Sequence, residues 1–162
     1  MSPHKNIEDT ANYLSELLRR KKEGYAGGLA NYWFIRLKSS NKVIGTFGFV
    51  GFNRKENCVE IGKGLSPSVW GKGFVYELLG IMMSYAFNVL NLSYMFSFTQ
   101  IDNVANIKSM ERGGFKIIKL IKDHEDGIGK KSDSVKMIAT KETANPGSCF
   151  ETARQKYRKF GI

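Results

Sequence analysis

The sequence predicts a mixed α/β domain built around a largely antiparallel sheet. Apolar residues recur at helical spacing in three segments, and short apolar or alternating runs between these segments indicate strands. Several of these runs are separated by short polar breaks of the kind found in hairpin turns, which favours antiparallel pairing. The predicted order is helix, three strands, helix, strand, helix and two strands.

The first helix is expected to begin at Asn6, whose side chain can cap its first turn. Apolar residues then recur at helical spacing up to Leu18, and Gly24, Gly27 and Gly28 end the helix. Three strand-like runs follow, from Tyr32 to Leu37, from Val43 to Phe52 and from Cys58 to Leu65. Polar breaks separate these runs, so we expect two successive hairpins.

A long helix is expected from about Gly73 to Leu90, because the segment is apolar on nearly every face, as in a helix packed beneath a sheet. The later elements are a strand from Tyr94 to Gln100, a helix from about Asn103 to Arg112, and strands from Phe115 to Ile121 and from Ser134 to Thr140. The basic residues 141–162 can form either a short docked helix or a frayed tail, and the sequence leaves both open.

The composition indicates one domain. The chain has 162 residues, of which 42% are hydrophobic, so it can bury a substantial core. We assign residues 1–140 to a single domain and residues 141–162 to a basic C-terminal segment. The cysteines Cys58 and Cys149 lie far apart, and neither is near a histidine in the sequence. A disulfide framework or a zinc site is therefore not expected, and no metal is assigned.

Neither the first residues nor the longest uncharged run of the chain suggests a membrane protein. The first residues are polar and contain no signal-peptide core, so a cytoplasmic location is expected. The run from Leu78 to Ile101 has no charged residue and is long enough to span a bilayer. Polar residues interrupt it, however, and its pattern changes midway from helical to extended. A buried helix followed by a central strand is favoured over a membrane span.

The segment from Glu60 to Glu77 carries the clearest chemical signal. A strand ends, a tight loop with Gly71 and Gly73 follows, and a helix begins at once. Glycines let such a loop curl until several backbone amides and the helix N-terminus point at one spot, which suits a phosphate group. Lys72 adds a positive charge there.

Two common phosphate-binding motifs do not match this loop. A Walker loop needs Ser or Thr after its Gly-Lys pair, and here Gly73 follows Lys72. A dinucleotide-binding fingerprint that starts at Gly62 meets Pro67 where its third glycine belongs. The loop therefore belongs to another class of phosphate site.

Several linked motifs identify that class. They are Glu60-Ile61-Gly62, Ser66-Pro67, Trp70-Gly71-Lys72-Gly73, Glu77, Asp102-Asn103-Val104-Ala105 and Glu111-Arg112-Gly113-Gly114-Phe115. In these motifs and their spacing, the chain resembles the GNAT superfamily of N-acetyltransferases from about residue 6 to residue 140. Within it, the chain most resembles the Rim-type branch, which is named for the N-terminal acetylation of ribosomal proteins.

The resemblance implies a GNAT-like splayed, mixed, mostly antiparallel sheet flanked by helices. Family members have seven strands, and the usual first strand and helix are absent from this chain. The resemblance also implies that acetyl-CoA, as co-substrate, binds between the two central strands with its pyrophosphate on the loop amides. The cofactor-binding residues carried over are Gly64, Leu65, Trp70, Gly71, Lys72, Gly73, Phe74, Val75, Asn103 and Asn106.

In such enzymes a neutral amine attacks the thioester directly in a ternary complex, and a strand amide polarises the carbonyl. Glu60 matches an acidic position from which a carboxylate can accept the amine proton through water. The alternative for Glu60 is a structural ion pair with a lysine such as Lys63 or Lys116. The family's usual proton donors are missing, because Asn106 stands in place of Ser and Met110 in place of Tyr.

The leading functional hypothesis is an acetyl-CoA-dependent N-acetyltransferase that acts on a primary amine. The acceptor can be a protein N-terminus, an amino sugar or another small amine, and the sequence does not choose among them. One alternative is a non-catalytic acyl-CoA-binding or regulatory module, and another is a nucleic-acid-binding protein. A homodimer is a further expectation, since either dimerisation or the C-terminal segment can cover the sheet edge left by the missing strand.

The net charge of the chain indicates which classes of partner it can attract. With 25 Lys and Arg against 15 Asp and Glu, the net charge is +10. This sign disfavours polycationic substrates such as spermidine and favours acidic partners. A ribosomal protein surrounded by ribosomal RNA and an acidic small molecule such as a nucleotide-linked amino sugar both meet that condition. Part of the charge also suits the phosphates of coenzyme A.

Overall fold

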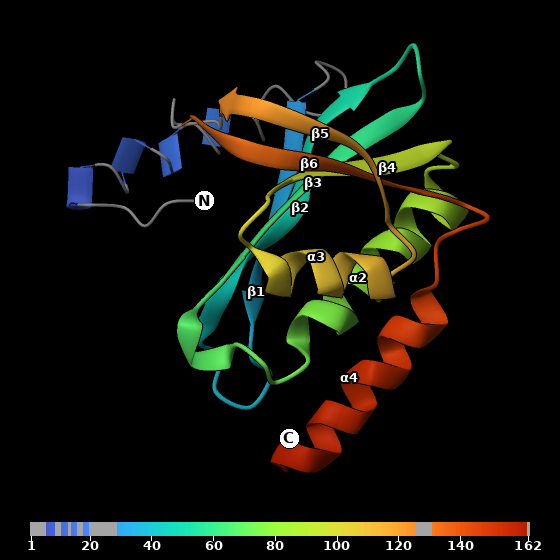
Figure 1. Ribbon diagram of the computed structural model, residues 1–162. Coiled ribbons are helices and arrows are strands. Elements are labelled where there is room, and N and C mark those ends of the chain that lie inside the picture. The colour runs from blue at the N-terminus through green and yellow to red at the C-terminus, as the bar shows by residue number, and fades with distance from the viewer. Residues whose placement is uncertain are drawn as a thin grey trace.

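The computed structural model describes residues 6–8, 11–12, 14–15, 18–19, 29–125 and 131–161 (Figure 1). The elements in chain order are β1 (Leu29–Arg36), β2 (Val43–Asn53), β3 (Cys58–Leu65), the 3-10 turn η2 (Pro67–Val69), α2 (Phe74–Ser84), the π-helical turn η3 (Tyr85–Val89), β4 (Tyr94–Gln100), α3 (Val104–Arg112), β5 (Lys116–Glu125), β6 (Lys131–Thr140) and α4 (Pro146–Phe160). The described residues at 7–8, 11–12, 14–15 and 18–19 are helical, as predicted. The predicted end of that helix, at Gly24, Gly27 and Gly28, lies outside the described residues.

The strands form one sheet in the order β1-β2-β3-β4-β6-β5. Every neighbouring pair is antiparallel except β3 and β4, which are parallel. The predicted mixed, mostly antiparallel sheet is therefore confirmed. The described residues contribute six strands, where the resemblance implied seven with the first one missing from this chain.

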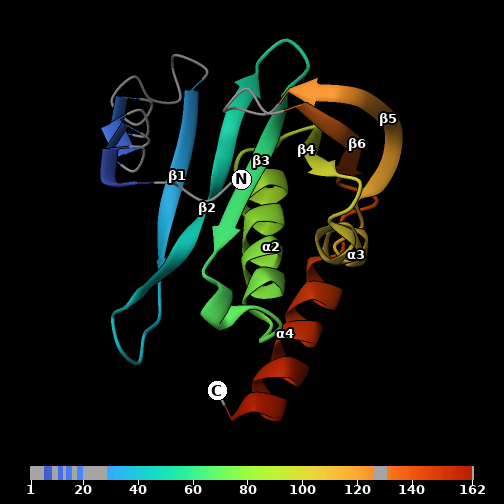
Figure 2. The same cartoon turned by 60° about the vertical axis from the view of Figure 1, so that its left-hand side comes forward.

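The parallel pair at the centre of the sheet is short. Its register ends at the pair Glu60–Phe96, although β3 continues to Leu65 and β4 to Gln100. Beyond that pair the two strands diverge (Figure 2). Each strand stays bonded to its other neighbour, β3 to β2 and β4 to β6. The sheet is therefore split open along the ends of its two central strands.

The hydrophobic core lies between the sheet and the helices α2, α3 and α4. Its members come from four strands and three helices, and examples are Phe47, Val59, Leu79, Met110 and Cys149, which are almost fully buried. Met82 and Met83 are buried core residues, as expected for a helix that packs beneath a sheet. None of the described helices is both long enough and apolar enough to cross a membrane.

The basic C-terminal segment forms a docked helix, which resolves the choice between helix and tail. Asn145 caps α4 by accepting a hydrogen bond from the Ser148 amide at 2.9 Å. The helix packs against α2, where Gly80 leaves room for Phe150: a Cβ at Gly80 would lie 2.7 Å from the Phe150 ring. The Tyr157 hydroxyl donates a hydrogen bond to the Glu77 carboxylate on α2. Both contacts hold α4 beside the start of α2.

Three predicted boundaries differ from the structure. The helix expected from Gly73 to Leu90 is regular only to Ser84 and then widens into a π-helical turn. The first strand begins at Leu29 and extends beyond its predicted start, because its pairing with β2 continues there. The last hairpin is longer than expected: β5 reaches Glu125 and β6 starts at Lys131. The predicted strands stop at Ile121 and resume at Ser134, whereas the pairing of β5 with β6 continues to the pair Glu125–Lys131.

Candidate active site

The opening between β3 and β4 is the centre of the candidate site. From Ile61 to Leu65, β3 has a ladder with β2 on one side and none with β4 on the other. A strand edge without a ladder leaves backbone N–H and C=O groups available for an extended ligand. The side chains of β3 alternate, so Glu60, Gly62 and Gly64 face away from the helices, whereas Ile61 and Lys63 face toward them.

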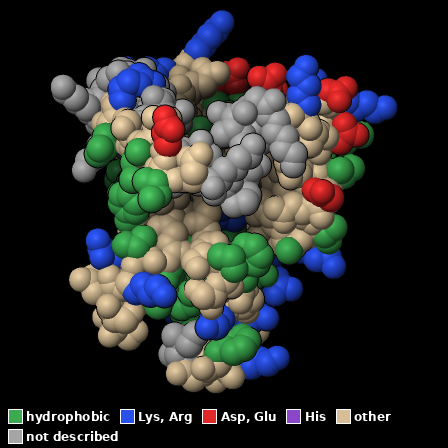
Figure 3. All heavy atoms as spheres, turned by 90° about the vertical axis from the view of Figure 1, so that its left-hand side faces the viewer, with side chains coloured by type: hydrophobic (Ala, Val, Ile, Leu, Met, Phe, Trp, Pro, Cys, Tyr) green, Lys and Arg blue, Asp and Glu red, His purple; other side chains and the backbone are tan. Residues whose placement is uncertain are grey.

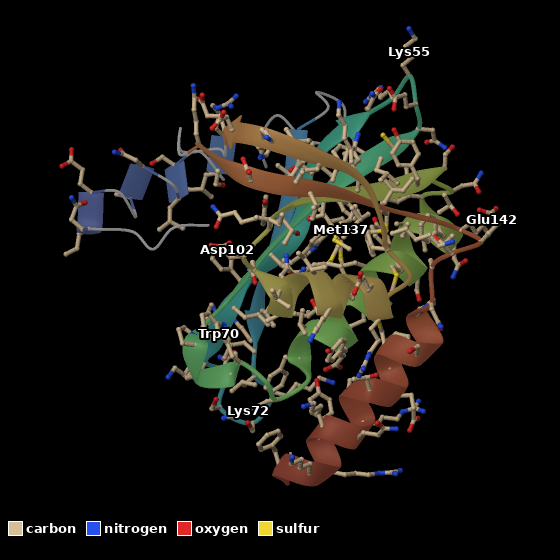
Figure 4. All side chains as sticks on the ribbon, viewed as in Figure 1. Lys55, Trp70, Lys72, Asp102, Met137 and Glu142 are labelled. Atoms are coloured by element: carbon tan, nitrogen blue, oxygen red, sulfur yellow. The ribbon has the colours of Figure 1, made fainter. Side chains whose placement is uncertain are left out.

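The loop that follows β3 is folded back onto the strand end. After the turn η2, the Trp70 indole nitrogen donates a hydrogen bond to the Leu65 carbonyl at 2.7 Å, while 67% of the side chain is exposed. Trp70 therefore shapes the loop through this hydrogen bond to the strand end, and not by packing into the core. In Figure 4, Trp70 and Lys72 lie together where the loop leaves the sheet, and Asp102 lies beyond the end of β4.

Gly71 and Gly73 give the loop its curvature. Gly71 has φ +74° and Gly73 has φ +101°, values that side-chain-bearing residues rarely adopt. A Cβ at Gly73 would also lie 2.7 Å from the Cβ of Lys156 on α4, whereas a Cβ at Gly71 would meet nothing within 4 Å. Gly71 is therefore required by its backbone angle, and Gly73 by both its angle and its close contact with α4.

The curvature of the loop leaves several backbone N–H donors unbonded at the start of α2. The amides of Trp70 and Lys72 are bonded within the loop, to Pro67 and Val69 at 3.1 and 3.4 Å. Within the described part of the chain, no backbone hydrogen bond occupies the amides of Gly71, Gly73, Phe74 and Val75. Of the six loop amides assigned to phosphate binding, four are thus available. The positive end of the α2 dipole adds to their attraction for an anion.

The two asparagines assigned to the cofactor have partners inside the protein. Asn103 caps α3, its side-chain oxygen accepting a hydrogen bond from the Asn106 amide at 3.2 Å. The Asn106 side chain donates to the Thr99 hydroxyl on β4 at 2.9 Å. These bonds fix the start of α3 beside the open end of β4. Both asparagines therefore lie at the opening, and their side chains already form hydrogen bonds that hold its structure in place.

Glu60 occupies the last paired position before the strands part. It lies opposite Gly51 on β2 and Phe96 on β4, and it is half-buried. On the same face of the sheet, Gly62 is necessary because a Cβ there would collide with the Tyr32 hydroxyl. Gly64 has open space where its side chain would be. On this face, the Tyr32 and Val50 side chains therefore fill the space above Gly62, and the open space lies at Gly64.

Lys63 is a residue whose importance the sequence analysis missed. Its ammonium nitrogen lies 3.1 Å from the sulfur of Met110, which is completely buried on α3. Burial lowers the pKa of Lys63 from 10.5 to about 8. One signal was available: Lys63 stands between Ile61 and Leu65 in the alternating pattern of a core-facing strand, where a lysine is unusual.

No cluster of three or more metal-ligating side chains occurs among the residues that the structure describes. Both cysteines, Cys58 and Cys149, are buried and unbridged, and burial raises the pKa of the Cys149 thiol to about 11. The chemistry at the opening thus involves Glu60, Lys63, the loop amides and the free edge of β3.

Comparison with known sequences gives a consistent result. A family model described as an acetyltransferase (GNAT) domain matches residues 1–116. A Bacillus licheniformis protein, named uncharacterized N-acetyltransferase p20, is 33% identical over 106 residues, which are 65% of this chain and 60% of that protein. Uncharacterized N-acetyltransferase YoaA of Bacillus subtilis (strain 168) is 32% identical over 84 residues, or 52% of this chain and 48% of its own length. The chain thus matches between about half and three fifths of these relatives' lengths.

Solved structures share the fold. Spermidine N-acetyltransferase from Vibrio cholerae, in complex with CoA and spermine, has a TM-score of 0.70 with 19% identity, covering 88% of this chain and 80% of that one. A chimera of the Vibrio cholerae enzyme SpeG and hSSAT has a TM-score of 0.68 with 20% identity, covering 81% and 76%. At such low identity the likeness concerns the fold alone, and it agrees with the splayed sheet and its flanking helices.

Proposed function

Because this chain belongs to the GNAT acetyltransferase family, we propose that it transfers an acetyl group from acetyl-CoA to a primary amine in a ternary complex. One observation carries the proposal: the split between β3 and β4 ends at a loop with four unoccupied amides at a helix N-terminus. A slot of this kind suits a long molecule that has an anionic end and an extended arm.

The residues at the opening fit acetyl-CoA as co-substrate. The amides of Gly71, Gly73, Phe74 and Val75 would bind the pyrophosphate, with Lys72 contributing charge. The free edge of β3, including Gly64 and Leu65, would bind the amide-containing arm through backbone hydrogen bonds. Acetyl-CoA supplies an activated acetyl group at the end of that arm.

The acceptor amine must be neutral when it attacks, so its proton needs an acceptor. Glu60 is the carboxylate at the point where the strands part, on the same face of β3 as Gly64, beside which space is open. We assign to Glu60 the role of a base that takes the proton through water. A backbone amide of β3 would stabilise the negative charge that develops on the thioester oxygen.

The acceptor class follows from charge. The net charge of +10 favours an amine that also carries negative groups, or one embedded in an acidic assembly. An amino sugar with a phosphate and the N-terminus of a ribosomal protein both qualify, and the second matches the Rim-type resemblance. Spermidine should be a poor acceptor although the fold resembles spermidine acetyltransferases, because like charges repel it.

A homodimer is part of the proposal. Among the described strands, β1 pairs on one side only, with β2, and it exposes 41% of Trp33 and 57% of Phe34. An apolar groove of about 460 Å³ between β1, β2 and α2 adjoins this edge and is lined in part by Trp33 and Tyr85. Light scattering coupled to size exclusion tests this: a mass of about 18.3 kDa would contradict a dimer.

A second candidate is an acyl-CoA-binding module without turnover. The observation in its favour is Met110, a buried residue without an ionisable group at the position where family members place their proton-donating tyrosine. This module would bind acetyl-CoA as the enzyme does, but it would release no free thiol in the presence of amines.

Thermal unfolding with acetyl-CoA is the first test. Ligand at about a hundred times its dissociation constant stabilises a protein by roughly 2.7 kcal/mol, which raises the midpoint by about 5–10 °C in a domain of this size. Release of the free thiol should then be followed over a panel of peptides, amino sugars and polyamines. A shift with turnover supports the enzyme, a shift without turnover on any acceptor supports the binding module, and no shift rejects both.

A further inference from the structure

Lys63 carries an amino group inside the protein at the opening between the central strands. It lies on β3 three residues beyond Glu60, so its backbone belongs to the part of the strand that has left β4. Its side chain turns to the helix side, where the nitrogen lies 3.1 Å from the Met110 sulfur. The residue as a whole is half-buried, and burial is the cause of its lowered pKa.

This environment leaves the ammonium group poorly satisfied. An ammonium has three donors, and a thioether sulfur is only a weak acceptor. Within the described residues, the Met110 sulfur is the one hydrogen-bond partner found for this nitrogen. A buried charge without a good partner is costly. Its position therefore needs an explanation other than the stability of the fold.

The charged groups on the neighbouring elements do not compensate for it. On β2 the residue opposite Lys63 is Phe47. On α3 the charged side chains of Lys108, Glu111 and Arg112 are exposed. The diverging half of β4 contains no ionisable side chain, and Glu60 lies on the other face of β3. Burial alone accounts for the lowered pKa of about 8.

We propose that Lys63 donates a proton to the sulfur of coenzyme A as the thioester breaks. The inference rests on the proposed function, because it requires acetyl-CoA in the opening. It assigns the role of proton donor to a lysine on β3, whereas the sequence pattern pointed to a position on α3 that is occupied by Met110.

The acceptor nitrogen attacks the carbonyl carbon of the thioester, and a C–N bond forms while the C–S bond breaks. The electron pair of the C–S bond stays on sulfur, which takes a proton from the Lys63 ammonium and becomes a thiol. Glu60 takes one proton from the acceptor ammonium before the attack, and the nitrogen loses a second proton to solvent as the amide forms. Lys63 regains its proton from solvent through the opening, and Glu60 releases its own to solvent.

The acidity of Lys63 is suited to this role. A thiol ordinarily titrates near pH 8.5, so a donor with a pKa of about 8 is closely matched to it. At neutral pH such a lysine is mostly protonated and ready to donate. An exposed lysine is a much weaker acid, and an arginine keeps its proton at any ordinary pH.

The test compares Lys63→Met and Lys63→Arg with the wild type, and with Lys141→Met as a control on a remote surface turn. Turnover is measured with acetyl-CoA and the best acceptor of the amine panel from pH 6 to about pH 10. For Lys63→Met we expect kcat to fall about 10²-fold, with the acetyl-CoA KM changed less than about threefold. The wild type should lose kcat above about pH 8, and the variant should lack this decline. Lys63→Arg should not restore kcat, and Lys141→Met should match the wild type.

Three results would overturn the assignment. A raised KM with unchanged kcat in Lys63→Met would make Lys63 a binding residue. Recovery of kcat in Lys63→Arg would show that a positive charge suffices and that no proton is given. Acetylation of wild-type Lys63 by acetyl-CoA alone, seen by mass spectrometry of its peptide, would make it a nucleophile. Absence of any thermal shift and any turnover in the wild type is a different failure, since it rejects the proposed function itself.

Discussion

Single residues at the opening are constrained in different ways, and Gly71 is the simplest case. Its φ of +74° excludes most side chains, yet a Cβ at this position would contact nothing within 4 Å. A substitution there should therefore disturb the backbone moderately and the ligand strongly. The left-handed conformation costs a side-chain-bearing residue about 1–2 kcal/mol.

We expect Gly71→Glu to abolish the thermal shift caused by acetyl-CoA, because its carboxylate would stand where the pyrophosphate is proposed to bind. Gly71→Ala carries the same backbone penalty without the charge, so it is the matched control. Both variants should melt lower than the wild type by similar amounts without ligand. If Gly71→Glu still bound acetyl-CoA as tightly as Gly71→Ala, the phosphate site would not be in this loop.

Glu60 is expected to matter most when the acceptor is protonated. Removing a general base lowers rates by about 10²–10⁴-fold, and we expect Glu60→Gln to show this loss below pH 7 and a much smaller one above about pH 9. Acetyl-CoA binding should be unchanged in the thermal titration. A rate profile parallel to that of the wild type across this range would show that Glu60 is not the base. Glu142→Gln, on the turn after β6, is the control.

Lys63 is expected to lower the stability of the folded protein. Its pKa is about 8 when folded and 10.5 in its ordinary state, so between these values the unfolded chain binds more protons. The free energy of unfolding of the wild type, as far as Lys63 contributes to it, therefore rises between about pH 8 and about pH 10.5. The shift corresponds to a penalty on the order of 3 kcal/mol at pH 7.

Lys63→Met should accordingly raise the thermal midpoint at pH 7 by several degrees, and the gain should shrink toward pH 10.5. Unfolding followed by circular dichroism over this pH range measures both effects, with Lys141→Met as the control. A lower midpoint at pH 7 would mean that Lys63 stabilises the fold and is not held there against a penalty.

At the scale of elements, the packing of α4 on α2 positions the loop. Lys156 on α4 lies against Gly73, and Tyr157 donates a hydrogen bond to Glu77 one turn into α2. Phe74 also packs against the Tyr157 ring, with ring centroids 5.4 Å apart. The basic C-terminal helix is therefore a support for the start of α2, where the unoccupied amides lie.

Tyr157→Phe should lower the free energy of unfolding by about 1–2 kcal/mol, since a hydrogen bond to a carboxylate is lost. Burial and the bond to Glu77 raise the pKa of Tyr157, so this contribution is complete below about pH 10 and fades at higher pH. A double-mutant cycle with Glu77→Gln, measured by denaturant unfolding at pH 7, isolates the pair. A coupling energy near zero would show that α4 is held by apolar contacts alone.

At the scale of the whole molecule, charge is unevenly distributed. On the face in Figure 3, acidic side chains gather in the upper half, and the coloured charged side chains of the lower half are Lys and Arg. The loop and α4 lie in the lower half of the molecule in Figure 1, and the views differ only by a turn about the vertical axis. On this face, the charged side chains coloured in the half of the molecule that holds the loop and α4 are therefore basic.

We expect acetyl-CoA affinity to weaken about threefold to tenfold between about 0.05 M and about 0.5 M NaCl, because salt screens attraction between exposed charges. S-acetylpantetheine lacks the phosphates and serves as the control ligand, with little salt dependence expected. Isothermal titration at both salt concentrations measures the change. Equal salt dependence for the two ligands would show that the net charge of +10 has another role.

Local patterns were sufficient to predict much of this architecture. The strands Cys58–Leu65 and Tyr94–Gln100 have the predicted boundaries, because turn-forming residues such as Asn57, Ser66 and Ser93 flank them. The loop with Gly71 and Gly73 was found because positive φ angles demand glycine. The length of β5 was underestimated, since strand pairing with β6 overrides the turn-like composition near Asp123.

The sequence by itself determined the order of the elements, the glycine-containing loop before α2 and the family. Hydrophobic periodicity, the conformational freedom of glycine and the spacing of motifs can all be read from the order of residues along the chain. The tertiary structure alone decided that β3 and β4 part after Glu60 and Phe96, that α4 docks beside Gly73, and that Lys63 meets Met110. These are contacts between residues as many as 83 positions apart, as for Gly73 and Lys156 (156 − 73 = 83). Their environment, including the low polarity that shifts the pKa of Lys63, exists only once the chain has folded.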